Sequence, residues 1–180
     1  MNLAIVDASL DQILMIAYKV AEAENKAVGL ILGKGFYSGA FHRHHEFQKK
    51  EVLKKIKIRF VKNCEEIEKF LINFHLNDEE ISSLVIDLKK YSLEDQSKIL
   101  SLANDVKEFL AGPKNVIACA PGFGSLQDMW FCYSRFMEQI FIMQNTEVCE
   151  LVYNSGEVSL ISTVSGIISF SFKSSRELDE

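Results

Sequence analysis

Asp87 ends a run of apolar residues and is therefore placed to do chemistry. Asp87 follows Leu84, Val85 and Ile86. A continuous apolar run of this kind is typical of a parallel strand that is covered on both faces. Such strands deliver a carboxylate to the C-terminal edge of a sheet, where α/β proteins bind ligands. Nucleoside-triphosphatases use an aspartate there to hold a magnesium ion. The alternative interpretation is that Asp87 only caps its own loop or the next helix.

A second candidate site is a basic stretch in a chain whose net charge is −5. Between His42 and Lys62 only Glu46 and Glu51 oppose the cations. Such a stretch can neutralise several phosphates and release their counterions, so it is a candidate DNA-binding surface. The alternative is a solvated helix and an exposed strand face. The predicted DNA-binding residues are Arg43, Lys49, Lys50, Lys54, Lys55, Lys57 and Arg59, and Lys62 belongs to the same stretch.

Three histidines stand beside this basic stretch, in the segment His42–Glu46. Zinc binds histidine together with carboxylate or cysteine ligands, but the spacing here matches no standard site and no partner cluster occurs. We therefore expect no metal, and we expect the segment to contact phosphate or to be plain surface.

Glycines and aromatic residues mark two further candidates. The loop Pro121–Gln127 contains Gly122, Phe123 and Gly124, and it is either a contact to a nucleic-acid base or backbone or a strand-to-helix turn. An aromatic band follows it, and we expect most of the band to be core and part of it to be an interface. The band consists of Trp130, Phe131, Tyr133, Phe136 and Phe141.

Composition limits the class of protein. The 180 residues are 48% hydrophobic and 25% charged, with two prolines and nine glycines, which is typical of a single globular domain. The four cysteines are widely spaced and form no CxxC, as in a reducing compartment. No signal peptide or membrane-length apolar run is evident, so we expect a soluble protein without a membrane partner.

Strand and helix patterns alternate along most of the chain. Apolar strands are predicted at Leu3–Val6, Val28–Leu32, Ile56–Val61, Leu84–Asp87 and Val116–Ala120, and helices separate them. We expect these helices near residues 9–25, 47–55, 63–74, 92–110 and 126–137. Strands then follow one another directly at 139–143, 148–153, 158–163 and 167–172, with Asn154-Ser155-Gly156 as a hairpin turn.

Alternating strands and helices require a mostly parallel sheet with helices on both faces. The predicted fold class is therefore α/β, with a C-terminal antiparallel β-meander that extends the sheet. We expect one domain over residues 1–173 and a polar tail over 174–180.

The run Lys57–Leu71, followed by Ser83–Asp87, resembles the RecA-like ATPase core of the recombinase paralogues. The strand Val116–Ala120 and the C-terminal meander also fit that family. The likeness is strongest to the small paralogue that partners the SWIM-domain protein in Shu-type recombination complexes. The resemblance implies a RecA-like fold and makes Asp87 the equivalent of the Walker B aspartate.

Two departures from the family pattern concern the nucleotide. An ATPase of this class carries Gly-x-x-x-x-Gly-Lys-Ser/Thr after its first strand, where glycine N–H groups wrap the phosphates. Here that place holds Ala8-Ser9-Leu10-Asp11-Gln12, and Asp11 would repel a phosphate. The family's catalytic glutamate after the second strand is replaced by Gly33-Lys34-Gly35. We therefore expect a protein that is not an enzyme and holds no cofactor.

The resemblance and these departures together predict a non-catalytic subunit of a homologous-recombination mediator complex in the nucleus. Its expected partners are a recombinase or recombinase paralogue and a SWIM-domain-type protein, with single-stranded DNA reached through the complex. Because the phosphate loop is missing, we also expect a partner to cover Leu3–Ile5. Two alternatives stay open, namely an α/β enzyme that uses Asp87 with His42–Glu46, and a purely structural interaction subunit.

Overall fold

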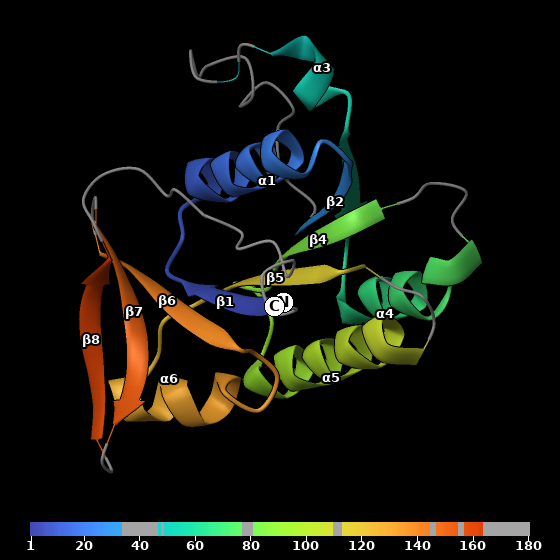
Figure 1. The fold of residues 1–180 in the computed structure, drawn as a ribbon. Coiled ribbons are helices and arrows are strands. Elements are labelled where there is room, and N and C mark those ends of the chain that lie inside the picture. The colour runs from blue at the N-terminus through green and yellow to red at the C-terminus, as the bar shows by residue number, and fades with distance from the viewer. Residues whose placement is uncertain are drawn as a thin grey trace, which may run out of the picture.

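The computed structural model describes residues 1–33, 47, 49–76, 81–109, 113–144, 147–154 and 157–163 (Figure 1). Predictions for Arg43, the His42–Glu46 segment, the strand at 167–172 and the tail at 174–180 lie outside these residues. The elements in chain order are β1 (Asn2–Val6), α1 (Leu10–Glu24), β2 (Ala27–Gly33), α3 (Lys50–Leu53), β3 (Ile56–Val61), α4 (Cys64–Ile72), the 3₁₀ turn η1 (Phe74–Leu76), β4 (Ile81–Asp87), α5 (Leu93–Phe109), β5 (Asn115–Ala120), α6 (Leu126–Tyr133), β6 (Gln139–Gln144), β7 (Glu147–Asn154) and β8 (Glu157–Thr163).

The strands of the described residues form one eight-stranded sheet in the order β3-β2-β4-β5-β1-β6-β7-β8. Every pair from β3 across to β6 is parallel, and β6–β7 and β7–β8 are antiparallel. The predicted α/β class, with a mostly parallel sheet and antiparallel C-terminal strands, is confirmed. One detail differs, because the first strand of the meander, β6, joins the sheet parallel to β1.

Helices cover both faces of this sheet (Figure 1). α1 and α3 pack on one face, and α4, α5 and α6 pack on the other. Each face has its own apolar cluster, and the central strands contribute alternate side chains to the two clusters, as a strand covered on both faces must.

β1 lies between β5 and β6, and Leu3, Ala4 and Ile5 are at most 1% exposed. The expectation that a partner covers Leu3–Ile5 is therefore wrong, because α1, α5 and α6 already enclose that strand.

Side-chain caps set the ends of the helices. Ser9 and Gln12 form a reciprocal capping box at the start of α1, and Asn25 ends that helix in the left-handed conformation with φ 55°. Asn63 accepts a hydrogen bond from the Glu66 backbone N–H at 3.1 Å and starts α4. α6 is shorter than predicted, because the backbone N–H groups of residues 136 and 137 both turn back to the Tyr133 carbonyl.

Candidate functional site at the carboxyl edge of the sheet

The connection between β1 and α1 lies where a RecA-like ATPase needs its phosphate loop, and it is three residues long, Asp7–Ser9. The Ser9 backbone N–H donates to Gln12 Oε1 at 2.6 Å, and the Gln12 backbone N–H donates to Ser9 Oγ at 3.3 Å. A helix N-terminus binds anions through such N–H groups. Here two of them are already bonded within the chain, and Asp11 adds a negative charge to the same turn.

Asp7 fastens this connection to the neighbouring loop. It adopts a positive φ of 60°, which is uncommon for a residue with a side chain. Its backbone N–H donates to the Ala120 carbonyl at 3.0 Å, and its Oδ1 accepts from the Gly122 backbone N–H at 2.6 Å. A Cβ on Gly122 would lie 2.3 Å from Asp7 Oδ2, so only glycine allows this approach. The ends of β1 and β5 are thus joined directly by hydrogen bonds.

Asp87 ends β4 at the same edge, as the sequence predicts. Its Oδ1 accepts from the Lys89 backbone N–H at 3.2 Å, so the carboxylate caps its own loop. The Lys89 ammonium donates to the Ala8 carbonyl at 2.8 Å. Because β5 lies between β4 and β1, the Lys89 side chain crosses the end of β5 to reach the β1–α1 connection. Lys89 carries no local sequence signal for this contact, since its partner is 81 residues away in the chain.

The carboxyl edge is thus closed by contacts within the chain. A carboxylate needs further oxygen or nitrogen ligands to retain a metal ion. Among the described residues no group of three histidine, cysteine or acidic side chains is placed to hold one. Asp87 is thus at the position that the Walker B resemblance implies, and the expectation that the chain holds no metal or cofactor stays a prediction.

Two buried titratable groups lie near this edge, and burial raises the pKa of each. The Tyr133 hydroxyl donates to Gln96 Oε1 at 2.8 Å, and burial raises the pKa of Tyr133 above its usual value. Burial also raises the pKa of Cys119, which pairs with Asp87 in the parallel register of β4 and β5. Both groups therefore stay protonated at neutral pH.

The predicted loop Pro121–Gln127 also belongs to this edge. It joins β5 to α6, and it ends in the Ser125 cap, where Ser125 Oγ accepts from the Asp128 backbone N–H at 3.2 Å. Gly124 has a positive φ of 57°, which a side chain would strain. The loop is therefore a strand-to-helix turn in this structure, and a nucleic-acid contact through it stays a prediction.

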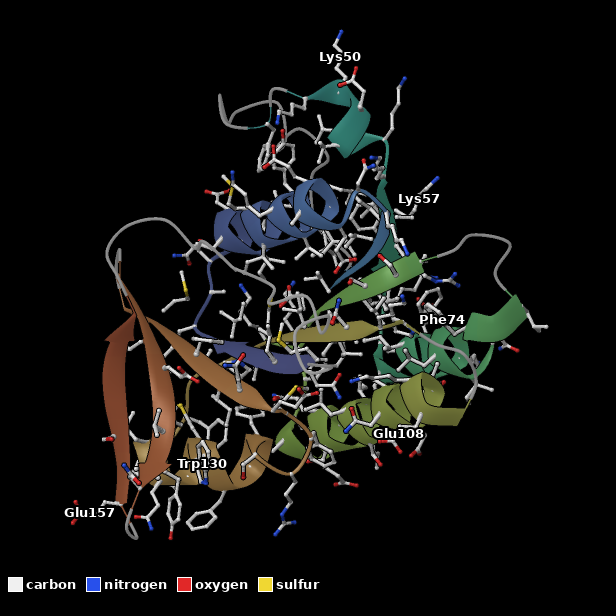
Figure 2. All side chains as sticks on the ribbon, viewed as in Figure 1. Lys50, Lys57, Phe74, Glu108, Trp130 and Glu157 are labelled. Carbon is white, nitrogen blue, oxygen red and sulfur yellow. The ribbon has the colours of Figure 1, made fainter. Side chains whose placement is uncertain are left out.

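The basic stretch occupies a different part of the molecule. α3 precedes β3 and so lies toward the amino edge of the sheet, and Figure 2 shows Lys50 and Lys57 extending away from the body of the protein. Lys50, Lys54 and Lys57 are exposed. Lys57 and Arg59 alternate with Ile56 and Ile58 on β3, so they lie on the α4 face while α3 lies on the α1 face. Those predicted DNA-binding residues that the structure describes therefore lie on or next to β3, at the edge of the sheet, and they are divided between its two faces.

Several of these cations already contact other side chains. Lys49 forms an ion pair with Glu22 at 2.7 Å, which holds the pKa of Glu22 below its usual value and that of Lys49 above it. Lys55 donates to Asn25 Oδ1, and the Arg59 guanidinium lies 4.9 Å from the centre of the Phe70 ring. Part of the basic stretch thus fastens α3 and β3 to α1 and α4.

The aromatic band lies partly in the core and partly at the surface, and its use as an interface stays a prediction. Tyr133 is buried, Trp130, Phe136 and Phe141 are half-buried, and Phe131 is 52% exposed. Trp130 stacks on Tyr153 of β7, with ring centres 5.9 Å apart and planes at 13°. Tyr153 was absent from the sequence prediction, because it lies 23 residues beyond Trp130 in the chain and only the fold brings it to α6. No helix of the described residues has the length and apolar character needed to cross a bilayer.

Comparison with solved structures finds the same architecture in a crystal structure of the RadB recombinase. The TM-score is 0.56 over 88% of this chain and 85% of that chain, at 11% sequence identity. This likeness establishes the fold, which is RecA-like. No known family profile matches the sequence, and no curated protein sequence matches it.

Proposed function

We propose that this protein is a non-catalytic RecA-fold subunit of a homologous-recombination mediator complex. In this proposal it works in the nucleus and assists the assembly or stability of a recombinase filament on single-stranded DNA. Its partners are a recombinase or recombinase paralogue and a SWIM-domain-type protein. It acts by binding these partners and does not hydrolyse ATP.

The observation that carries this proposal is the closed carboxyl edge in a RecA-like fold. A triphosphate needs free backbone N–H groups and a lysine at the β1–α1 connection. The chain instead has a three-residue connection there, with a capping box, and the Lys89 ammonium donates to the Ala8 carbonyl. A fold of this class that keeps its sheet and helices but closes its phosphate site is suited to binding partners.

The DNA part of the proposal rests on the exposed cations of α3 and β3. Lys50, Lys54 and Lys57 project into solvent in a chain that is acidic overall. Their number is small, so single-stranded DNA is expected to bind the complex more tightly than the isolated subunit.

The test is affinity purification of the tagged protein from its native cells, followed by identification of stoichiometric partners. The proposal predicts a recombinase or recombinase paralogue among them, and no such protein with an unrelated tagged protein as control. Recovery of stoichiometric partners with no recombinase among them would contradict it.

A second candidate is a structural interaction subunit that does not contact nucleic acid. The specific observation in its favour is that Lys49 and Lys55 are bonded to Glu22 and Asn25, so packing already explains part of the basic stretch. A DNA mobility-shift assay on the purified complex separates the two candidates. A shift that depends on the α3 lysines supports the first, and an unshifted probe supports the second.

A further inference from the structure

Two lysines from separate elements converge on one carboxylate where α3 meets α1. Lys49, the residue before α3, has its Nζ 2.7 Å from Glu22 Oε1, and Lys19 of α1 has its Nζ 3.4 Å from Glu22 Oε2. Each oxygen of the Glu22 carboxylate therefore has an ammonium group beside it. Lysine binds phosphate through the same kind of charge-assisted hydrogen bond. The chain thus forms an anion site and supplies the anion itself.

This site is open to solvent. The side chains of Lys49, Lys19 and Glu22 are 64%, 41% and 29% exposed. Ion pairs that are exposed to this degree add little to stability, because water and salt screen them. An external anion can therefore reach both ammonium groups and replace the carboxylate at small cost.

Other contacts hold α3 on α1 when this ion pair is broken. The Tyr18 ring packs against Phe47 with ring centres 5.1 Å apart, and the Tyr18 hydroxyl accepts from the Lys49 backbone N–H at 3.2 Å. Val52 is 7% exposed and belongs to the apolar cluster on the α1 face of the sheet. None of these contacts uses the Lys49 ammonium, so Lys49 can change its partner while α3 stays in place.

We propose that Lys19 and Lys49 form a phosphate-binding site that Glu22 occupies in the unbound protein, and that a backbone phosphate of single-stranded DNA displaces Glu22. The inference rests on the DNA part of the proposed function. It adds Lys19 of α1, which lies outside the basic stretch, and it adds a competitor within the chain. Glu22 lowers the affinity for DNA, because a phosphate must break the existing ion pairs before it binds here.

A nucleic-acid backbone suits this surface better than an acidic peptide does. Lys50 and Lys54 lie one turn apart at α3, since the Lys54 backbone N–H donates to the Lys50 carbonyl at 3.1 Å, and both side chains are exposed. Together with the Glu22 site they form a series of cations that successive phosphates of one strand can contact. A glutamate-rich peptide would only exchange one carboxylate for another, whereas DNA also releases its condensed counterions.

The test is fluorescence anisotropy of a labelled oligothymidine with the purified chain. Glu22→Gln removes the competing charge and keeps the shape of the side chain. At about 0.1 M salt this variant should bind at least about threefold more tightly than the native chain. The slope of log K against log salt should become steeper by about 0.7 for each lysine that gains a phosphate contact. Thermal unfolding verifies that the variant is folded.

Glu94→Gln is the matched control. Glu94 pairs with Lys98 at 2.8 Å on α5, so this variant removes the same charge and also breaks a lysine ion pair. α5 lies across the sheet from α3 (Figure 1), and at about 0.1 M salt charges are screened over about 10 Å, so DNA binding should stay close to native.

A double variant locates the effect at Lys49. Glu22→Gln in a Lys49→Met background should gain much less affinity than it gains in the native background, because the freed ammonium is then missing. The inference is overturned if Glu22→Gln binds DNA no more tightly than the native chain, if Glu94→Gln gains as much, or if the gain is undiminished in Lys49→Met.

Labelled polyglutamate distinguishes the two kinds of partner. Tighter binding of polyglutamate by Glu22→Gln without tighter binding of DNA overturns the inference and indicates a site for acidic peptides. The anisotropy experiment uses the chain alone and needs no recombinase. Failure to recover a recombinase from native cells therefore contradicts the mediator proposal without affecting this result.

Discussion

The carboxyl edge of the sheet and the α3–β3 surface both carry lysines, but these lysines are used differently. At the carboxyl edge the Lys89 ammonium turns inward and donates to the Ala8 carbonyl. On α3, Lys50 and Lys54 extend into solvent. The first arrangement closes a site that binds phosphate in ATPases with this fold, and the second leaves positive charge free for an external partner. The same RecA-like fold thus has one edge whose polar groups are hydrogen-bonded within the chain and one surface whose lysines are exposed to solvent.

The largest expected effect concerns the open region. Charge reversal of Lys49, Lys50, Lys54 and Lys55 to glutamate should weaken DNA binding by the purified complex on the order of a hundredfold. The slope of log K against log salt should become shallower by up to about 3, because each phosphate contact with single-stranded DNA contributes about 0.7 to the slope. Fluorescence anisotropy at several salt concentrations measures both quantities.

The matched control for this experiment reverses four lysines elsewhere on the surface, namely Lys69, Lys90, Lys98 and Lys114. All four are exposed, and they lie outside the α3–β3 surface, so their reversal changes net charge by the same amount. If the control weakens DNA binding as much as the α3 variant does, the effect is one of total charge and the predicted DNA-binding residues are wrong.

The next effect concerns the hydrogen bond that joins β1 to β5 at the closed edge. Gly122→Ala places a Cβ within 2.3 Å of Asp7 Oδ2, so the carboxylate must leave the Gly122 N–H. We expect the free energy of unfolding to fall by about 1 to 3 kcal/mol in urea denaturation. At Gly33 the nearest side-chain atom would be 3.7 Å from a new Cβ, so Gly33→Ala should change stability by less than about 0.5 kcal/mol. Equal losses from both variants would show that the Asp7 contact contributes nothing specific.

A smaller effect is expected from Lys89. Lys89→Met removes the hydrogen bond to the Ala8 carbonyl and keeps most of the apolar stem, so stability should fall by about 1 kcal/mol. Amide hydrogen exchange in the β1–α1 connection should become faster at the same time. Lys90→Met, at the neighbouring exposed position, should leave both measurements unchanged. Unaltered exchange in Lys89→Met would mean that this lysine does not hold the edge closed.

The smallest effect concerns a thiol near the start of α4. Burial, together with the Glu68 carboxylate that accepts from Sγ at 3.2 Å, raises the pKa of Cys64 to about 12. The thiol is therefore protonated well above pH 8, and its alkylation should be slow there. Glu68→Gln removes the negative charge, so the pKa should fall and alkylation in a Cys132→Ser background should accelerate modestly. A pH–rate profile that does not move would exclude an electrostatic role for Glu68.

The sequence predicted those features that depend on neighbours in the chain. The apolar run before Asp87 gave β4 its position, and Ser9 and Asn63 marked the helix starts, because capping acts within one turn. α6 was predicted too long, since no glycine or proline marks its end and the chain leaves the helix through a turn after Tyr133. The parallel entry of β6 beside β1 also had no local signal.

The contacts that define the closed edge were beyond prediction from sequence, because they depend on the order of strands in the sheet. Lys89 reaches Ala8 because a single strand, β5, lies between β4 and β1, and the lysine side chain is long enough to cross it. Asp7 meets Gly122, from 115 positions away, because β1 and β5 are paired neighbours in the sheet. The lack of glycine and lysine after β1 showed in the sequence that the phosphate loop is missing. The contacts that take its place could be identified only from the folded structure.

The most direct test of the account is equilibrium binding of magnesium ATP to the purified protein, followed with a fluorescent ATP analogue and repeated on Asp87→Ala. The account predicts no saturable binding at millimolar nucleotide for either protein, because the β1–α1 connection and Lys89 occupy the phosphate site. Saturable micromolar binding that is lost in Asp87→Ala would contradict it.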